Sequence, residues 1–400
     1  MPISEPSHLA LFITSLVGGG AERVTLNLAA ALADRGHTLD LLVGRKEGQL
    51  HEHIPAAVRI IDLGAASARQ LLPTVLKMPH TAKGLASTLL HPKAPWILGA
   101  VPALVRYLND RHPATLLSVR NYANIAALLA WRLKSGSSTR LVISAHNHLT
   151  VAATHARKAY RRKFPQLARS LYPEADRIVA VSNGVAEDLV QSIGLPRSRI
   201  TTIYNPVFHP ELLAQARDTL THEWFVPGAP PVVLGIGKLK PQKDFACLVR
   251  AFARVLATRP ARLLILGEGP QREALVSLAY KLGVTDAVSL PGFVANPFAY
   301  MGRAAVFVLS SAWEGLSNVV IEALACGCPV VSTDCPSGPA EILDGGAYGR
   351  LVPVGDDAAL ARAIVATLDQ PLAPERLRDR ARLFSVNHAA ERYLNVLLGD

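Results

Sequence analysis

The sequence predicts an α/β protein built from two doubly wound parallel sheets in tandem. Short runs rich in Val, Ile and Leu alternate with helical patterns along the chain, which is typical of parallel sheets covered by helices on both faces. This alternation breaks once, near residue 205, and then restarts. The length of 400 residues also fits two domains, at roughly 100–200 residues per domain.

The first predicted domain covers residues 1–205. Its strands are expected at 9–16, 38–44, 58–64, 115–120, 140–146, 177–182 and 200–206. Helices are expected at 21–35, 125–134 and 184–193. The first of these ends at Gly36, a residue typical of helix C-termini.

The second predicted domain covers residues 206–373, after a linker rich in proline and glycine. Its strands are expected at 232–237, 262–267, 287–292, 305–310 and 329–334, and its helices at 245–258, 271–282 and from Asn318. Residues 374–400 form a C-terminal helical segment, which is expected to pack back towards the N-terminal domain.

Composition excludes several classes of protein. Half of the residues are apolar, so the chain is not disordered, and four cysteines in 400 residues indicate reduced thiols in a cytoplasmic protein. The net charge of +11 is uneven. Residues 64–170 contain 16 Lys or Arg and a single acid, Asp110, which gives this segment a charge of +15. Such a block indicates an anionic surface as partner.

Ligands of doubly wound sheets bind at the carboxyl ends of strands, and two such domains face to face would form a cleft. The first candidate cluster, residues 18–23, follows the first strand and opens a helix. Its glycines let a backbone approach a ligand closely, and free N–H groups at a helix N-terminus suit an anion. A tight strand–helix turn explains the same residues. The pattern is not the dinucleotide fingerprint.

The second cluster, residues 237–244, also lies between a strand and a helix. Lys238 and Lys243 could both reach a diphosphate, although a solvated basic loop is the ordinary alternative. The third cluster, residues 314–322, begins just after a strand. Ser317 is expected to be the N-cap of a helix that starts at Asn318, whose first N–H groups would suit phosphate oxygens.

Glu322 lies on this otherwise apolar helix, where a carboxylate needs partners to offset its desolvation. The vicinal hydroxyls of a sugar would serve. A structural cap followed by a surface glutamate is the alternative interpretation of the cluster.

Together these motifs resemble glycosyltransferase family 4. The resemblance rests on Glu314 and Glu322 after an apolar strand, on the segment 237–243, and on residues 19–23 near the N-terminus. Residues 267–270, 290–293 and 325–331 also resemble family segments, so the similarity covers nearly the whole chain. It implies the GT-B fold, with two Rossmann-like domains.

The resemblance also implies roles for individual residues. Glu322 would hold ribose hydroxyls, Glu314 would act as a catalytic residue at the donor sugar, and backbone groups near Phe293 would contact the base. The family usually has Arg at the position of Lys238, and Lys lacks the bidentate fork of Arg. The expected donor-binding residues are Gly19, Gly20, Lys238, Lys243, Val294, Gly315, Leu316, Ser317, Asn318 and Glu322.

His146 follows the strand 140–146, where the family often has a histidine facing the donor sugar. The resemblance favours His146 over His148 as the second catalytic residue. From the residues alone, a capping or core histidine is the favoured interpretation. The chain has no Asp-x-Asp motif. We therefore expect lysines and helix N-termini to neutralise the diphosphate, with no metal and no cofactor besides the nucleotide sugar.

The basic block suggests the acceptor. Arg157, Lys158, Arg161, Arg162 and Lys163 flank Tyr160 and Phe164, which are expected to seat in a membrane interface. An apolar patch is expected near Lys93 and Arg106, formed by Trp96, Ile97, Leu98, Val101 and Leu104. A solvated basic face over ordinary core helices is the alternative. No nucleic-acid-binding module is recognised.

The sequence therefore predicts a retaining, metal-independent hexosyltransferase. It would move a sugar from a nucleotide diphosphate, with UDP expected, to a hydroxyl of a lipid-linked, polysaccharide or lipopolysaccharide acceptor at the cytoplasmic face of an anionic membrane. A soluble sugar-on-sugar synthase of the same fold is the first alternative. A non-catalytic relative that binds a nucleotide sugar or a membrane is the second, and a sugar-nucleotide epimerase is a weaker third.

Overall fold

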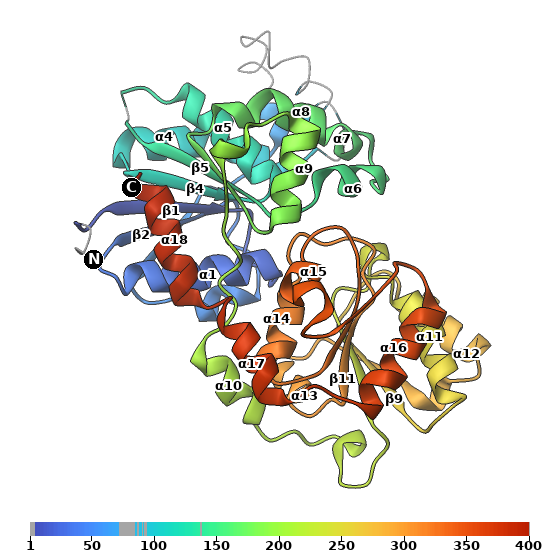
Figure 1. Ribbon diagram of the computed structural model, residues 1–400. Coiled ribbons are helices and arrows are strands. Elements are labelled where there is room, and N and C mark those ends of the chain that lie inside the picture. The colour runs from blue at the N-terminus through green and yellow to red at the C-terminus, as the bar shows by residue number, and fades with distance from the viewer. Residues whose placement is uncertain are drawn as a thin grey trace. The chain divides into compact units, whose positions relative to one another are not determined.

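A computed structural model describes residues 5–71, 85, 88–89, 91, 94–136 and 138–399. The chain divides into two compact units (Figure 1). Unit 1 comprises Met1–Pro206 and Val386–Asp400, and unit 2 comprises Val207–Ser385. The first boundary thus falls one residue beyond the one expected from the sequence.

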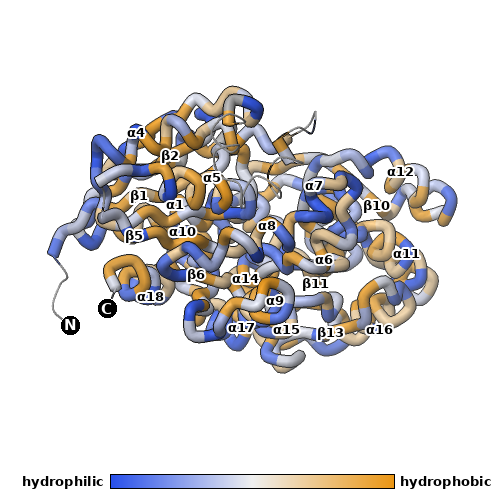
Figure 2. The backbone as a smooth tube through the Cα atoms, turned by 90° about the horizontal axis from the view of Figure 1, so that it is seen from above, coloured by the Kyte–Doolittle hydropathy of each residue, from blue (hydrophilic) through white to orange (hydrophobic). Residues whose placement is uncertain are grey.

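Unit 1 contains a parallel sheet in the order β3-β2-β1-β4-β5-β6-β7. Every expected strand of this domain has a counterpart. The central strands β1, β4 and β5 are buried on both faces, which explains why they are rich in Leu, Ile, Val and Ala, whereas the edge strands β3 and β7 are only partly buried. The strands are β1 (His8–Ile13), β2 (Thr38–Val43), β3 (Val58–Asp62), β4 (Thr115–Val119), β5 (Arg140–Ala145), β6 (Arg177–Ala180) and β7 (Ile200–Thr202). In Figure 2 the tube of β1 is mostly orange, as expected of a central buried strand.

The helices of unit 1 cover this sheet. They are α1 (Gly20–Ala33), α4 (Val101–Arg111), α5 (Asn121–Leu133), α6 (Leu149–Thr154), α7 (Ala159–Arg162), α8 (Phe164–Leu171), α9 (Asn183–Ile193) and α18 (Val386–Leu398). The sequence analysis did not predict α4, which contains Pro102. Pro102 lies in the first turn, where its missing N–H costs nothing.

The sequence analysis expected the C-terminal helical segment 374–400 to pack back towards the N-terminal domain, and the second of its two helices belongs to unit 1. Helix α17 (Pro374–Arg382) belongs to unit 2 and packs against α14 (Asn318–Ala325). Helix α18 belongs to unit 1, where it contacts α1, β4 and β5 (Figure 1, red). Its Ala390, Tyr393 and Leu397 are buried in the core of that unit.

Unit 2 contains a second parallel sheet, in the order β10-β9-β8-β11-β12-β13. Five strands match the expected ranges, namely β8 (Val232–Ile236), β9 (Arg262–Leu266), β10 (Val288–Gly292), β11 (Val306–Leu309) and β12 (Val330–Thr333). The short edge strand β13 (Arg350–Val352) was not predicted. Strand order reverses between β8 and β11, so the loops after these two strands are neighbours at the edge where ligands of such sheets bind.

The helices of unit 2 lie on both faces of its sheet (Figure 1). Besides α14 and α17 they are α10 (Pro210–Arg217), α11 (Phe245–Leu256), α12 (Arg272–Lys281), α13 (Phe298–Met301), α15 (Pro339–Ile342) and α16 (Asp357–Asp369). Helix α14 begins at Asn318, as predicted.

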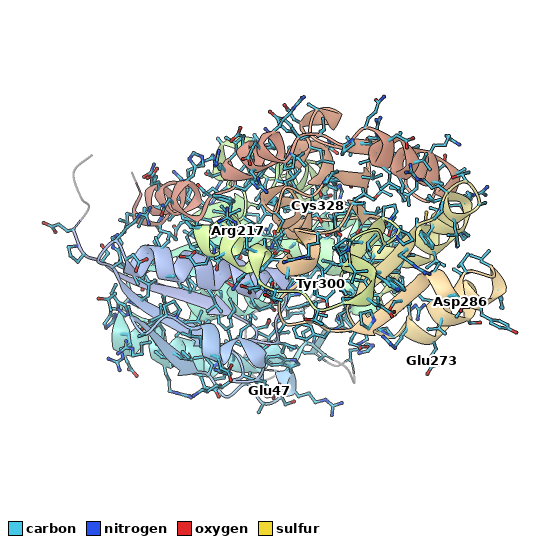
Figure 3. All side chains as sticks on the ribbon, turned by 90° about the horizontal axis from the view of Figure 1, so that it is seen from below. Glu47, Arg217, Glu273, Asp286, Tyr300 and Cys328 are labelled. Atoms are coloured by element: carbon cyan, nitrogen blue, oxygen red, sulfur yellow. The ribbon has the colours of Figure 1, made fainter. Side chains whose placement is uncertain are left out.

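All four cysteines are free thiols buried in unit 2. Burial raises the pKa of the Cys247 thiol to about 11 and that of Cys328 to about 12. Figure 3 shows Cys328 among the packed side chains of that unit. Within the described part of the chain, no helix combines the length and the apolar character that crossing a bilayer requires.

Candidate functional site

The loops that follow β8 and β11 are joined by three hydrogen bonds in unit 2. Ala312 N donates to Gln242 O at 2.8 Å, and Gln242 Nε2 donates to Trp313 O at 2.7 Å. Ser310 Oγ donates to the backbone oxygen of Lys243 at 2.7 Å. These bonds fix the loop after β8, which bears Lys243 (the lysine loop), against the loop after β11, which bears Glu314 (the glutamate loop). The two residues are 71 positions apart in the sequence.

Lys243 and Glu314 form an ion pair at this junction. Lys243 Nζ lies 2.7 Å from Glu314 Oε1, and the side chains are 15% and 10% exposed. Ser311 Oγ donates to the same oxygen at 2.7 Å. The aliphatic stem of Lys243 crosses Gly237, where a Cβ would lie 3.2 Å from Lys243 Cε. The pair is therefore oriented on both sides, and the lysine ammonium retains further N–H donors for a ligand.

Close backbone packing beside this pair requires two glycines. Gly267 and Gly269 have φ values of 134° and 158°, and a Cβ at either would collide with the backbone of Gly237 or Leu239. Leu239 N donates to the backbone oxygen of Glu268 at 2.8 Å. The segment 267–270, which the sequence analysis noted only as a family resemblance, thus shapes the lysine loop.

The N-terminus of α14 is the second part of the site. Ser317 occupies the N-cap position, but its side chain makes no capping hydrogen bond, contrary to the expectation. Ser317 Oγ is buried, and within the described part of the chain it has no hydrogen-bond partner. Gly338, with φ of 92°, packs against this turn, where a Cβ would lie 3.0 Å from Gly315 O. A buried hydroxyl at a helix N-terminus is suited to an anionic ligand.

Of the remaining donor-site candidates, Gly19 and Gly20 lie in unit 1 at the start of α1, and the others lie in unit 2. Lys238 is exposed, and it forms no ion pair within the described residues. Glu322 is half-buried one turn along α14 from Asn318. Phe293 is 58% exposed just after β10, and Val294 follows it. An exposed aromatic ring at the carboxyl edge of a strand is available to stack on a planar base.

In unit 1, His146 follows β5 and shares a hydrogen bond with Ser144, since its Nε2 lies 3.0 Å from Ser144 Oγ. Burial, and then the positive charge of Arg120, lower the pKa of His146 to about 3. The imidazole is therefore neutral near pH 7. His148 instead lies 3.2 Å from the carboxylate of Asp188, which also accepts from the backbone of Leu149. This arrangement gives His148 a structural role at the start of α6.

An ion pair between Arg120 and Glu22 was not predicted. Glu22 is 3% exposed in the first turn of α1, and it pairs with Arg120 after β4. Arg120 has φ of 85° and ψ of 153°, a backbone conformation that costs on the order of 1–3 kcal/mol in a non-glycine residue. The Glu22 carboxylate also folds against Gly19, where any Cβ would collide with it. The Glu22 carboxylate thus complements the positive N-terminal end of the α1 dipole. The sequence analysis expected Gly19 and Gly20, at this same helix end, to bind an anion of the donor. Glu22 and Arg120 are 98 positions apart in the sequence. The only local indication of the pair was therefore the acidic residue in the first turn of the helix.

The structure overturns the expected apolar membrane contacts. Tyr160 and Phe164 are 5% and 4% exposed, because both pack edge-on against Tyr122 in unit 1. In the expected apolar patch, Ile97 is 3% exposed, Leu98, Val101 and Leu104 are fully buried, and Trp96 is partly buried. Arg157, Arg161, Arg162 and Lys163 are exposed, and Lys158 is half-buried. Lys93 lies outside the described residues, as does part of the block 64–170. The described surface of this segment is therefore basic without being apolar.

The family model described as Glycosyltransferase Family 4 matches residues 18–208, and that described as Glycosyl transferases group 1 matches residues 230–370. A relative from Campylobacter jejuni is 30% identical over 98% of this chain and 99% of its own. The chain belongs to glycosyltransferase family 4.

The relative from Campylobacter jejuni is an N-acetylgalactosamine-N,N'-diacetylbacillosaminyl-diphospho-undecaprenol 4-alpha-N-acetylgalactosaminyltransferase. The lipopolysaccharide core biosynthesis glycosyltransferase LpsE of Rhizobium meliloti is 35% identical over 53% of this chain and 58% of its own. Two solved structures share the fold. HepE from Anabaena, in complex with UDP and glucose, has a TM-score of 0.74 at 19% identity, covering 98% of this chain and 99% of its own. Sucrose-phosphate synthase from Thermosynechococcus elongatus has a TM-score of 0.76 at 20% identity, covering 97% of both chains.

These comparisons confirm the predicted GT-B fold, with two Rossmann-like parallel-sheet domains, and the predicted family. The protein is a glycosyltransferase.

Proposed function

We propose that this glycosyltransferase uses a nucleotide diphosphate sugar, with UDP as the expected nucleotide, and transfers the sugar with retention of configuration. The observation that carries the proposal is the ion pair of Lys243 and Glu314 beside the N-terminus of α14. A lysine, a carboxylate and the N-terminus of a helix at the switch point of a doubly wound sheet provide for a diphosphate and for sugar hydroxyls together.

In the proposed arrangement, Lys243 and the backbone of Gly315–Asn318 hold the diphosphate, while Ser317 Oγ donates to one of its oxygens. Lys238, which is exposed, closes over the same group. Glu314 accepts from hydroxyls of the donor sugar, and Glu322 accepts from the ribose. Phe293 and the backbone near Val294 contact the base.

Chemistry in this site consists of one exchange at the anomeric carbon. The bond from that carbon to the β-phosphate oxygen breaks, and a bond to the acceptor hydroxyl oxygen forms on the same face. The acceptor proton passes to the departing phosphate oxygen. Lys243 stabilises the negative charge that develops on the diphosphate, which is the largest demand of the step. His146, being neutral, exchanges hydrogen bonds with hydroxyls rather than supplying a charge.

The proposed acceptor is a hydroxyl of a lipid-linked or polysaccharide-type glycan, bound by unit 1. Two observations support it. The name of the Campylobacter jejuni relative includes a diphospho-undecaprenol acceptor, and the basic residues Arg157, Arg161, Arg162 and Lys163 of unit 1 are exposed. An anionic membrane surface is the expected partner of those residues, which would place the enzyme at the inner face of the membrane.

A soluble sugar-on-sugar synthase is the second candidate function. The burial of Tyr160 and Phe164 favours it, because the apolar half of the expected membrane contact is absent from the described surface. The two functions share the donor site and differ only in the acceptor.

The deciding experiment is a transfer assay with a panel of UDP-, GDP- and ADP-sugars, each offered with a diphospho-undecaprenol oligosaccharide and with free sugars. Consumption of one UDP-sugar only with the lipid-linked acceptor is the expected result. Transfer to free sugars alone supports the synthase, and protection against melting by no nucleotide sugar contradicts both functions. We also expect EDTA to leave the rate unchanged. Loss of activity that Mg²⁺ or Mn²⁺ restores contradicts metal independence.

A further inference from the structure

Unit 1 contains a basic pocket at the amino-terminal ends of its strands, whereas His146 lies at their carboxyl ends. The pocket has a volume of about 250 Å³. Arg140 and Arg177 are the first residues of β5 and β6, and Thr201 lies in the neighbouring strand β7. Because Arg177 pairs with Val142 and Thr201 pairs with Val179, the strand register directs all three side chains to the same face.

Helix α18 closes the pocket from above this face. Arg392, Asn395 and Gly399 line it. Arg392 and Asn395 are three residues apart and share one face of the helix, and Gly399 follows its last residue. Val142 and Val179 belong to the core against which α18 packs, so the pocket continues the helix–sheet interface outwards from that core.

Among the described residues, the lining of the pocket includes three arginines and no acidic side chain. Within the described residues, none of its three arginines forms an ion pair with a carboxylate. Asp176, next to Arg177, instead accepts a hydrogen bond at 2.7 Å from the backbone of Leu141. Three guanidinium groups in close proximity repel one another, so an anion between them stabilises the arrangement.

Arg140 supplies a second, independent observation. Its Nε is buried, and within the described residues it has no hydrogen-bond partner. The guanidinium packs so closely against Gly399 that a Cβ there would lie 2.6 Å from Nη1, and Gly399 has φ of 92°. The group is thus held in place while a donor remains unsatisfied, which is costly unless a ligand accepts from it.

We propose that this pocket binds a phosphate-bearing anion and thereby fastens α18 to the sheet. Arginine forks match phosphate oxygens, and Thr201 and Asn395 add neutral hydrogen-bonding groups. The site is separate from the donor site in unit 2. Helix α18 starts where the chain returns from unit 2 to unit 1. An anion bound in the pocket therefore controls how firmly this C-terminal helix is anchored in unit 1.

The test uses the full chain and inorganic phosphate as probe. Thermal unfolding is followed with increasing phosphate, with NaCl adjusted to constant ionic strength, and phosphate affinity is measured by calorimetry. The variants are Arg177→Gln and Arg392→Gln, singly and together, with Arg169→Gln as a matched control because Arg169 is exposed on α8 of the same unit. Lys243→Ala tests whether phosphate acts through unit 2 instead.

The expected result is that phosphate raises the midpoint of unfolding of the wild type, of Arg169→Gln and of Lys243→Ala. Its affinity should fall roughly ten-fold or more in the double variant, because charged hydrogen-bond donors are lost. An unchanged response in the double variant, or no response of the wild type beyond that to NaCl, overturns the proposal.

A second arm separates a soluble anion from a lipid headgroup. Wild type and double variant are sedimented with phosphatidylglycerol vesicles, with and without phosphate. Sedimentation that phosphate reduces only in the wild type assigns the site to a headgroup. Equal sedimentation of both proteins, together with the calorimetric difference, assigns it to a soluble phosphate compound.

Discussion

Lys243 Nζ and Glu314 Oε1 lie 2.7 Å apart, so the cation proposed for the diphosphate and the carboxylate proposed for the donor sugar form one unit. Their loops are held together by one backbone hydrogen bond and two side-chain hydrogen bonds, and Ser311 fixes the carboxylate from the other side. An ammonium carries three N–H donors, so Lys243 can keep Glu314 while it binds a phosphate oxygen. The pair thereby couples the position of the sugar to that of the leaving group.

Lys243→Ala should lower turnover by roughly 10²–10³-fold, because the charge that opposes the developing negative charge on the diphosphate is lost. Stability should fall less, by about 1–3 kcal/mol, because Glu314 keeps Ser311 but loses its cation. Turnover at saturating donor and urea unfolding measure the two effects.

The control is the double variant Lys243→Met, Glu314→Gln, which retains the packing over Gly237 and removes both charges. It should recover most of the lost stability while staying inactive. Full activity in Lys243→Ala removes this lysine from the site.

Glu322→Ala should weaken the binding of UDP by roughly 1–3 kcal/mol, because ribose hydroxyls lose their acceptor. The nucleoside uridine should lose the same increment, since the interaction does not involve phosphate. Calorimetry with both ligands measures this, and circular dichroism verifies the fold. Unchanged affinity for both ligands contradicts the ribose assignment.

Glu322→Gln provides a matched control, because the amide retains one acceptor oxygen at nearly the same size. Its affinity should lie between those of the wild type and the alanine variant.

His146 should make the protein sensitive to acid, because its pKa of about 3 in the folded state is far below its value of 6.5 in the unfolded chain. Below pH 6.5 the unfolded chain binds a proton that the folded protein excludes. The stability contributed by neutral His146 is therefore fully present above pH 6.5 and is lost as the pH falls towards 3. Relative to His146→Asn, the wild type should lose about 1.4 kcal/mol of unfolding free energy per pH unit in that range.

Urea unfolding of both proteins between pH 8 and pH 4 measures this difference, and His148→Asn is the comparison variant. A difference between wild type and His146→Asn that does not change with pH contradicts the buried neutral imidazole. The rate of transfer should show no ionisation of His146 between pH 5 and pH 9.

The sequence was sufficient for every described strand except the short edge strand β13, and for the position of the two loops that are proposed to bear the donor site. Val- and Leu-rich strands are buried on both faces, and the charged clusters after β8 and β11 stand out because strand ends are where polar side chains gather. The order β10-β9-β8-β11 then brings the two loops together. The start of α14 at Asn318 followed from local residues alone, and it was predicted to the residue.

The burial of individual side chains in unit 1 could not be predicted from the sequence in the same way. Tyr160 and Phe164 alternate with basic residues, and this pattern is the same for a membrane-seated face and for a core face beneath a charged surface. The aromatic ring of Tyr122, 38 residues away from Tyr160, decides between them, and no local signal reports it. For the same reason the Glu22–Arg120 pair was beyond sequence reasoning, and so was the division of the C-terminal helical segment between the two units.

The exposed basic residues of unit 1 should bind anionic membranes by charge alone. Each Lys or Arg near an anionic leaflet contributes about 1 kcal/mol, and this falls with salt within a Debye length. The protein should therefore sediment with phosphatidylglycerol vesicles at low salt, much less at 0.5 M NaCl, and hardly at all with neutral vesicles.

Because Phe164 is buried, Phe164→Leu should not weaken sedimentation of the folded protein. Gln at residues 157, 158, 161, 162 and 163 should abolish it and leave UDP affinity unchanged. The matched control replaces five exposed basic residues of unit 2 by Gln and should sediment as the wild type, these residues being Arg217, Lys281, Arg350, Arg362 and Arg376. Wild-type protein that ignores anionic vesicles even at low salt removes the surface argument for a lipid-linked acceptor and makes the soluble synthase the better-supported function.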